Sequence, residues 1–270
     1  MSGVVEPQGA PDPEIDAEIG ELIGRLSSDE DMDKETRGRL LGRLARLLSA
    51  SARRAGVTGI AGGRWLGDVF AYVAPRIPVR DLETLRRHHD GHLGELLADD
   101  LVRMATNGTT AVGAAGGALA AVEFVAPPLL LSVPAQLVAE TLVVSAIEVK
   151  LIAELHEVYG VQVPGGGSAR AAVFLTAWAK QRGINPMAGG TMTVALGTAA
   201  KQALRKRLLR ILGRHLTTLG PFLTGAVAGG ALNRAFTRRL AESVRKDLRR
   251  HVGPSAPVGP VDRPRLGPAD

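Results

Sequence analysis

The stretch MATNGTTAVGAAGGALAAV, residues 104–122, contains no charged side chain and is rich in glycine and alanine. Residues 183–200 and 215–233 have the same character, with His215 as their only ionisable group. A bilayer-spanning helix needs roughly 20 predominantly apolar residues, and these stretches have the length but are diluted by Gly, Thr and Asn. They predict re-entrant or shallowly inserted helical hairpins, with close packing inside a soluble helical bundle as the alternative.

Glycines recur at helical spacing inside two of these stretches. Gly113 and Gly117 are four residues apart, as are Gly225 and Gly229. This spacing lets two helix backbones approach closely. We therefore expect these four glycines at helix-packing contacts.

The rest of the chain shows apolar residues at helical spacing, and the period-two alternation of strands is absent. The sequence therefore predicts an all-α fold, a multi-helix bundle with Gly/Ala-rich helical hairpins. The first expected helix begins near Pro13. Others run from Asp33 to Gly56, from Trp65 to Val73 and, without a break, from Asp81 past Leu101. A later helix ends at Gly160, and two more begin at about Ser168 and Leu232.

Composition shifts mark the expected domain boundaries. Residues 1–12 and 253–270 read as disordered tails. Amphipathic helices occupy residues 13–80, and a larger helical domain occupies residues 81–252. Within that domain VPGGGSAR holds an internal linker, residues 163–169, because three glycines follow a proline.

The net charge of +6 is distributed unevenly. Residues 1–35 hold eleven Asp and Glu, whereas residues 201–250 hold thirteen Lys and Arg. A basic half is attracted to polyanions, either phospholipid headgroups or nucleic acid. Cysteine is absent, which removes thiolate chemistry and disulfides. The acidic, proline-bearing start does not resemble a secretory signal, so we expect an unexported, cytoplasmic protein.

Basic helices flank the uncharged stretches, as expected where arginine meets anionic headgroups at about 1 kcal/mol each. A solvated helix face is the alternative interpretation. The candidate lipid-contacting residues are Arg205, Arg207, Arg210, Arg214, Arg238 and Arg245.

Polar residues in and just after an otherwise apolar helix form a candidate functional cluster. Its members are Glu140, His156, Glu157 and Tyr159. A carboxylate in an apolar helix must find a partner or become protonated, and an arginine from the basic helices would suit Glu140. A histidine beside carboxylates could perform acid–base chemistry, although capping of the helix C-terminus explains the same pattern.

The segment RRHHDGH offers a possible metal site. If the helix continues through it, His88 and His92 lie one turn apart, followed on the same face by Glu95 and Asp99. A polar helix face with His89 partly buried is the alternative. Neither a nucleotide-binding glycine motif nor a hydrolase elbow is present, and no cofactor is expected.

The segments LIAELHEVYGVQVPG (151–165), QRGINP (181–186) and PFLTGAVAGGALNRAFTRRLAESVRKDL (221–248) resemble the EcsC protein family. The similarity rests on the order of Tyr159-Gly160, Pro221, Gly225-Ala226 and Asn233, and covers roughly residues 85–250. It implies a bacterial-type helical protein that is commonly regarded as membrane-associated, with no established activity or catalytic residues.

Together these features predict a non-enzymatic, amphitropic helical protein on the inner face of the cell membrane. Its expected partner is anionic lipid or a membrane protein. The alternatives are a nucleic-acid-binding protein and a metal-dependent enzyme that uses His88 and His92. Only nine aromatic residues are available for base stacking, which disfavours nucleic acid.

Overall fold

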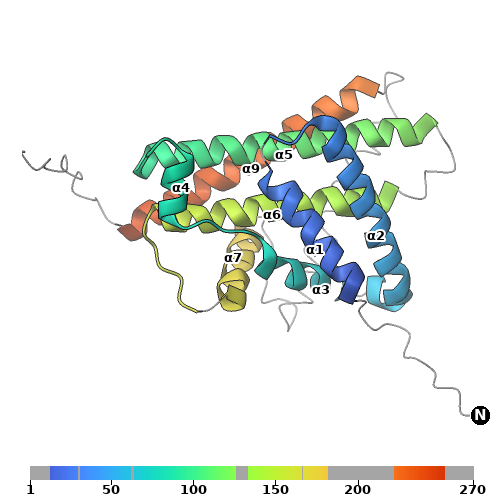
Figure 1. Cartoon of the computed structure of the whole chain (residues 1–270), viewed down its shortest axis with the longest axis horizontal. Coiled ribbons are helices and arrows are strands. Elements are labelled where there is room, and N and C mark those ends of the chain that lie inside the picture. Colours follow the sequence, from blue (N-terminus) through green and yellow to red (C-terminus); the bar gives the residue numbers. More distant parts are fainter. Residues whose placement is uncertain are drawn as a thin grey trace, which may run out of the picture.

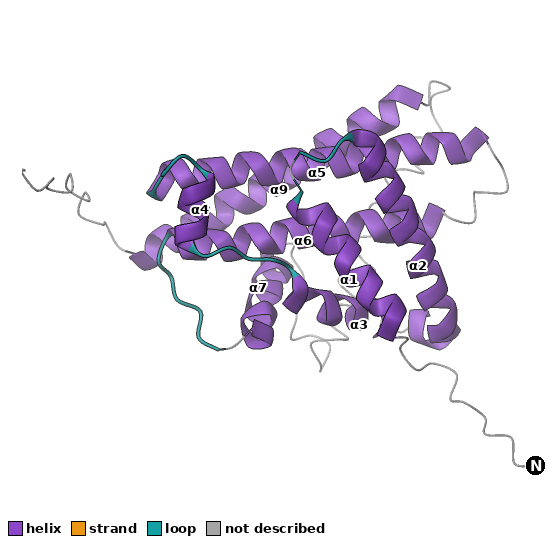
Figure 2. Cartoon of the chain, in the orientation of Figure 1, coloured by secondary structure: helices purple, strands orange, loops and turns teal. Residues whose placement is uncertain are grey.

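A computed structural model describes residues 13–29, 31–61, 64–125, 133–165, 167–181 and 222–252. Within these ranges every regular element is a helix (Figure 2). The predicted all-α class is therefore confirmed for the described part of the chain.

Three helices, α5 (Gly94–Val125), α6 (Val133–Val158) and α9 (Phe222–Val252), run side by side along the long axis of the molecule (Figure 1). The chain direction of α5 is opposite to that of α6 and α9. The first two helices, α1 (Pro13–Ser28) and α2 (Lys34–Ala61), pack against α6.

Shorter helices complete the bundle around α6. The segment α3 (Arg64–Val73) leads into the 3-10 helix η1 (Ala74–Arg76), which contacts α7 (Gly167–Gln181). The rings of Phe70 and Trp178, 5.9 Å apart, join α3 to α7. One continuous core includes side chains from residues 13–80 and from residues 81–252, so the described parts of these two expected domains share a core. The expected tails lie outside the described residues.

Helix α6 is the central element of the fold. From Gln136 to Leu155 its side chains are buried, Thr141 being only half-buried, because helices surround it on several sides. Its buried charges include Lys150, whose Nζ lies 2.7 Å from a carboxylate oxygen of Glu154. The apolar residues on all faces of α6 are therefore explained by the helices packed around it.

The expectation of one helix from Asp81 past Leu101 is wrong. Asp81 caps α4 (Leu82–His88) by accepting a hydrogen bond from the Thr84 backbone N–H at 2.8 Å. The helix then ends, because Asp90 and Gly91 have φ values of 52° and 77° in the left-handed region. Helix α5 starts afresh at Gly94.

Other boundaries follow the sequence more closely. Gly56 has φ 68° and interrupts α2 where the sequence predicts a helix end. Gly160, with φ 66°, ends α6 as expected. The uncharged residues 104–122 lie in one uninterrupted helix, α5. The turn expected at Pro127 and Pro128 lies outside the described residues, and α7 begins inside the predicted linker.

Candidate functional site

The four residues of the predicted polar cluster do not gather at one place. Glu140 and His156 are sixteen positions apart on α6, about 24 Å along the helix axis. His156 donates from Nδ1 to the Ile152 carbonyl oxygen of its own helix at 2.7 Å, and its ring packs edge-on against Phe174. Burial lowers the pKa of His156. Glu157 pairs with Arg170 at 2.7 Å, so this part of the cluster ties α6 to α7.

Glu140 is buried against the glycine-rich part of α5. A Cβ atom at Gly116 would lie 1.8 Å from Oε1 of Glu140, so the absence of a side chain there makes room for the carboxylate. Gln136 donates from Nε2 to the Gly116 carbonyl oxygen at 2.7 Å and to Glu140 at 3.5 Å. The basic helix proposed as its partner, with Arg205, Arg207, Arg210 and Arg214, lies outside the described residues.

A second buried carboxylate, Glu148, is the centre of a network that the sequence analysis did not identify. Its oxygens accept hydrogen bonds from Trp178 Nε1 at 2.8 Å and from Thr237 Oγ1 at 2.9 Å, while Thr237 Oγ1 also lies 3.1 Å from Thr109 Oγ1. The network therefore joins α5, α6, α7 and α9. The sequence feature that could have identified Glu148 is its position as a second carboxylate in the same apolar helix as Glu140.

Two of the four glycines assigned to helix packing, Gly113 and Gly229, lie between α5 and α9. A Cβ atom at Gly113 would lie 2.7 Å from the Gly229 carbonyl oxygen, and one at Gly229 would lie 2.8 Å from the Gly113 carbonyl oxygen. Asn233 seals this contact by donating from Nδ2 to the Thr109 carbonyl oxygen at 3.0 Å. Gly117 is half-buried on α5, and the surroundings of Gly225 lie outside the described side chains.

Ion pairs close one end of the bundle. Arg245 binds Glu95 and Asp99, and Arg249 binds Glu95 with Nη2 2.5 Å from Oε2. The Tyr159 hydroxyl, placed by the turn at Gly160, donates to Glu95 at 2.9 Å. Hydrogen bonds from Arg249 and Arg245 lower the pKa of Glu95 to about 2. We call these five residues the ion-paired end.

This arrangement revises two sequence-based expectations. Arg245 was a candidate for lipid contact, but only 14% of its side chain is exposed and its guanidinium is held by two carboxylates. Tyr159 was a member of the candidate functional cluster, and burial raises its pKa while its hydroxyl lies between Glu95 and Arg245. Arg238, by contrast, is exposed.

The possible metal site is not assembled. His88 is the last residue of α4 and His92 lies in the following turn, so they do not share a helix face. His92 Nδ1 instead lies 2.6 Å from Asp100, whose other oxygen pairs with Arg103. The hydrogen bond to His92 lowers the pKa of Asp100. Among the described residues no group of three His, Cys, Asp or Glu side chains could hold a metal ion.

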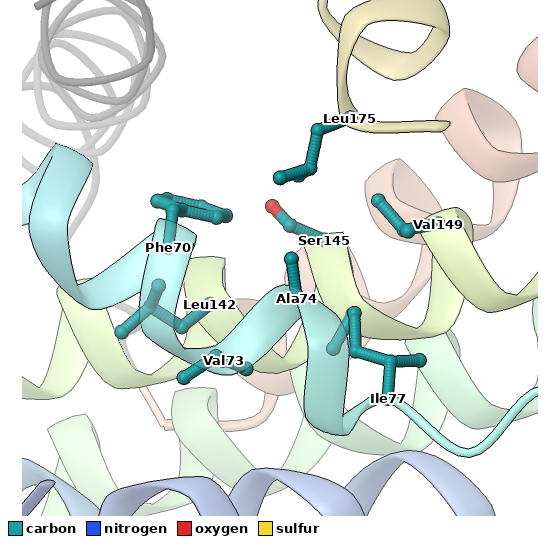
Figure 3. Close-up of a pocket in the computed structure, with 9 residues that line it drawn as sticks. Phe70, Val73, Ala74, Ile77, Leu142, Ser145, Val149 and Leu175 are labelled. Atoms are coloured by element: carbon teal, nitrogen blue, oxygen red, sulfur yellow. The ribbon is translucent and has the colours of Figure 1, made fainter. Parts of the chain in front are cut away.

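A small pocket lies where α3, η1 and α7 meet α6 (Figure 3). Apolar side chains such as Phe70, Leu142 and Leu175 line it. Ser145 is the one polar residue on its wall, and its hydroxyl donates to the Thr141 carbonyl oxygen at 2.7 Å. Ligand sites usually combine an apolar wall with several convergent polar groups, so this pocket is a packing defect of the core.

The three long helices carry little charge toward the opposite end of the bundle. Gly113 meets Gly229, and Gly116 meets Glu140, so the second half of α5, the start of α6 and the start of α9 lie at the same end of the bundle (Figure 1). Residues 104–139 contain one charged side chain before Glu140, that of Glu123, and residues 222–233 contain none. We call the uncharged segments of these three helices, residues 104–122, 133–139 and 222–233, the charge-free end. In the described residues, none of the helices combines the length and apolarity of a membrane span.

Comparison with known proteins found no matching family model, no similar curated protein and no similar solved structure. The resemblance to the EcsC family therefore stays a prediction. Support for a function comes from the fold and from the two ends of the bundle.

Proposed function

We propose that the protein is an amphitropic, non-enzymatic helical protein of the EcsC type that binds the surface of an anionic membrane from the cytoplasmic side. The observation that supports this is the polarity of the bundle. Three helix segments almost without charge converge at one end, and carboxylate–arginine pairs close the other end.

The charge-free end suits shallow contact with lipid. In the sequence, residues 126–132 between α5 and α6 read APPLLLS and contain three leucines and no charge. Apolar residues at an interface bury themselves about 5–10 Å into the boundary of headgroups and acyl chains. Hydrogen bonds within α5 and α9 satisfy the backbone polar groups in the interior of these helices, as insertion requires, and Gly113 and Gly229 let the two helices touch.

Vesicle flotation tests the proposal. The purified chain is mixed with phosphatidylcholine vesicles, with or without phosphatidylglycerol, at low and at moderate salt. We expect flotation with the phosphatidylglycerol vesicles and weaker binding as salt screens the arginines. Failure to float with either vesicle at low salt would overturn the proposal.

A further inference from the structure

The exposed cations of α9 fall into two groups that differ in how far they are neutralised. The first group, Arg234, Arg238 and Arg239, directly follows the charge-free residues 222–233. The second group, Arg245, Lys246, Arg249 and Arg250, lies about two to three turns beyond Arg239, at the ion-paired end. Only uncompensated charge attracts an anionic surface strongly, so the two groups must be compared residue by residue.

The first group retains most of its charge. Arg234 donates to a neutral group, Oδ1 of Asn107, at 3.0 Å. Arg238 lies 3.7 Å from Glu242, with both side chains largely exposed, so the pair is weak. Arg239 is exposed, and within the described part of the chain no carboxylate lies at salt-bridge distance from it. Three arginines therefore face one glutamate.

The second group is largely neutralised. Arg249 and the largely buried Arg245 share Glu95, Arg245 also pairs with Asp99, and Arg250 lies 3.6 Å from Asp247. Lys246 is exposed. Four cations thus meet three carboxylates, and the net attraction of this region for a polyanion is small.

We propose that Arg234, Arg238 and Arg239 form a basic collar that binds the phosphates of anionic phospholipids and orients the bundle with its charge-free end toward the bilayer. This inference rests on the proposed function and adds an orientation and a headgroup-binding site to it. The ion-paired end then points away from the membrane, with α4 beside it (Figure 1).

In this orientation the collar, and not the ion-paired end, lies close to the headgroups. At 1.5 Å per residue, Arg238 and Arg239 lie about 6–8 Å beyond Arg234. All three collar positions therefore fall within about one Debye length, roughly 8–10 Å, of a headgroup layer at the edge of the charge-free end. Arg249 lies about 22 Å from Arg234 along the axis and is beyond the reach of that layer.

Matched charge removals on one helix test the collar. Arg238→Gln/Arg239→Gln removes two collar charges, and Lys246→Gln/Arg250→Gln removes two charges from the other end. In flotation with phosphatidylglycerol vesicles we expect the collar variant to bind roughly 25-fold more weakly, because each arginine near an anionic surface contributes about a factor of five. The control should lose about twofold or less, since its charges lie beyond about one Debye length. Equal losses in the two variants would overturn the orientation.

Site-specific labelling gives an independent readout. The chain has no cysteine, so Ala121→Cys near the end of α5 and Glu83→Cys on α4 each accept a single fluorophore. With the protein bound to vesicles that carry nitroxide-labelled lipid, we expect strong quenching at position 121 and little at position 83. The reverse pattern would overturn the inference.

The outcomes separate this inference from the proposed function. If the unmodified chain and the collar variant float equally well, the proposed orientation is wrong and the proposed membrane binding stands. If the unmodified chain does not float and instead binds duplex DNA in a salt-dependent way, both proposals fail in favour of a nucleic-acid partner.

Discussion

Gly113 of α5 and Gly229 of α9 meet backbone to backbone, with no space for a Cβ atom on either residue. A methyl group at Gly113 would lie 2.7 Å from both the Gly229 carbonyl oxygen and Asn233 Nδ2. Since backbone cannot yield without separating the helices, Gly113→Ala should lower the free energy of unfolding by about 1–3 kcal/mol. Urea unfolding followed by circular dichroism measures the change.

The matched control for that prediction is Gly108→Ala on the same helix. There the nearest atom is Ile147 Cδ1 at 3.5 Å, an ordinary contact with the end of a side chain. Alanine favours helix over glycine by about 1 kcal/mol, so this variant should be unchanged or more stable. If both variants behave alike, the close contact of α5 with α9 is not the cause.

The buried network around Glu148 should respond to loss of one hydroxyl. Thr237→Val removes a 2.9 Å hydrogen bond to the carboxylate while keeping the side-chain volume. We expect a loss of about 1–3 kcal/mol in the free energy of unfolding, because a buried acceptor loses a donor. Thr141→Val is the control, since its hydroxyl bonds only the Leu137 carbonyl oxygen within α6. A cost below about 0.5 kcal/mol at Thr237 would contradict the prediction.

Acid should destabilise the ion-paired end through Glu95. Its pKa is about 2 in the folded chain and near 4.5 when unpaired, so its stabilising contribution is present above pH 4.5 and is lost as the pH falls toward 2. The carboxylate is half-exposed, which limits the contribution to about 1 kcal/mol. Unfolding of the wild type and Glu95→Gln should differ at pH 7 and converge near pH 2.

Glu83→Gln is the control for this acid effect, because Glu83 is exposed and its nearest arginine nitrogens lie 3.7 Å and 3.8 Å away. It should track the wild type at both pH values. If acid lowers the stability of the wild type no more than that of Glu95→Gln, the ion pairs of Glu95 with Arg245 and Arg249 contribute little.

Alanine should lower the stability at Gly91, in the turn between α4 and α5, and raise it at Gly42, within α2. Gly91 has φ 77°, so Gly91→Ala should cost about 1–2 kcal/mol even though the surrounding space is open. Gly42, within α2, is also open but helical, so Gly42→Ala should gain about 1 kcal/mol. Thermal unfolding of both variants checks the pair, and a stabilised Gly91→Ala would contradict the left-handed turn.

Local rules predicted most of the helices. Asp81 caps α4, Gly56 interrupts α2 and Gly160 ends α6, each through a backbone conformation that its residue type favours. The break at Asp90 was missed because the leucine pattern continues across it at helical spacing. Periodicity records which residues are apolar, and Leu93 and Leu96 turn out to be exposed.

The candidate site was harder to predict, because its contacts join distant parts of the chain. Sequence spacing marked Gly113 and Gly229 as helix-packing residues, but it did not predict that they touch each other. Arg245 looked free for lipid because its partners, Glu95 and Asp99, lie about 150 positions earlier. Ion pairs of this kind follow from tertiary packing, which local propensity does not encode.

The separation of α5 from α9 along the chain also has a consequence during synthesis. Helix α5 ends at Val125 and α9 begins at Phe222. At roughly 5–20 residues per second, a ribosome needs about 5–20 s to make the intervening segment. For that time the glycine-lined face of α5 is without its antiparallel partner, so the nascent chain presents an uncharged surface that chaperones or a nearby bilayer can cover first.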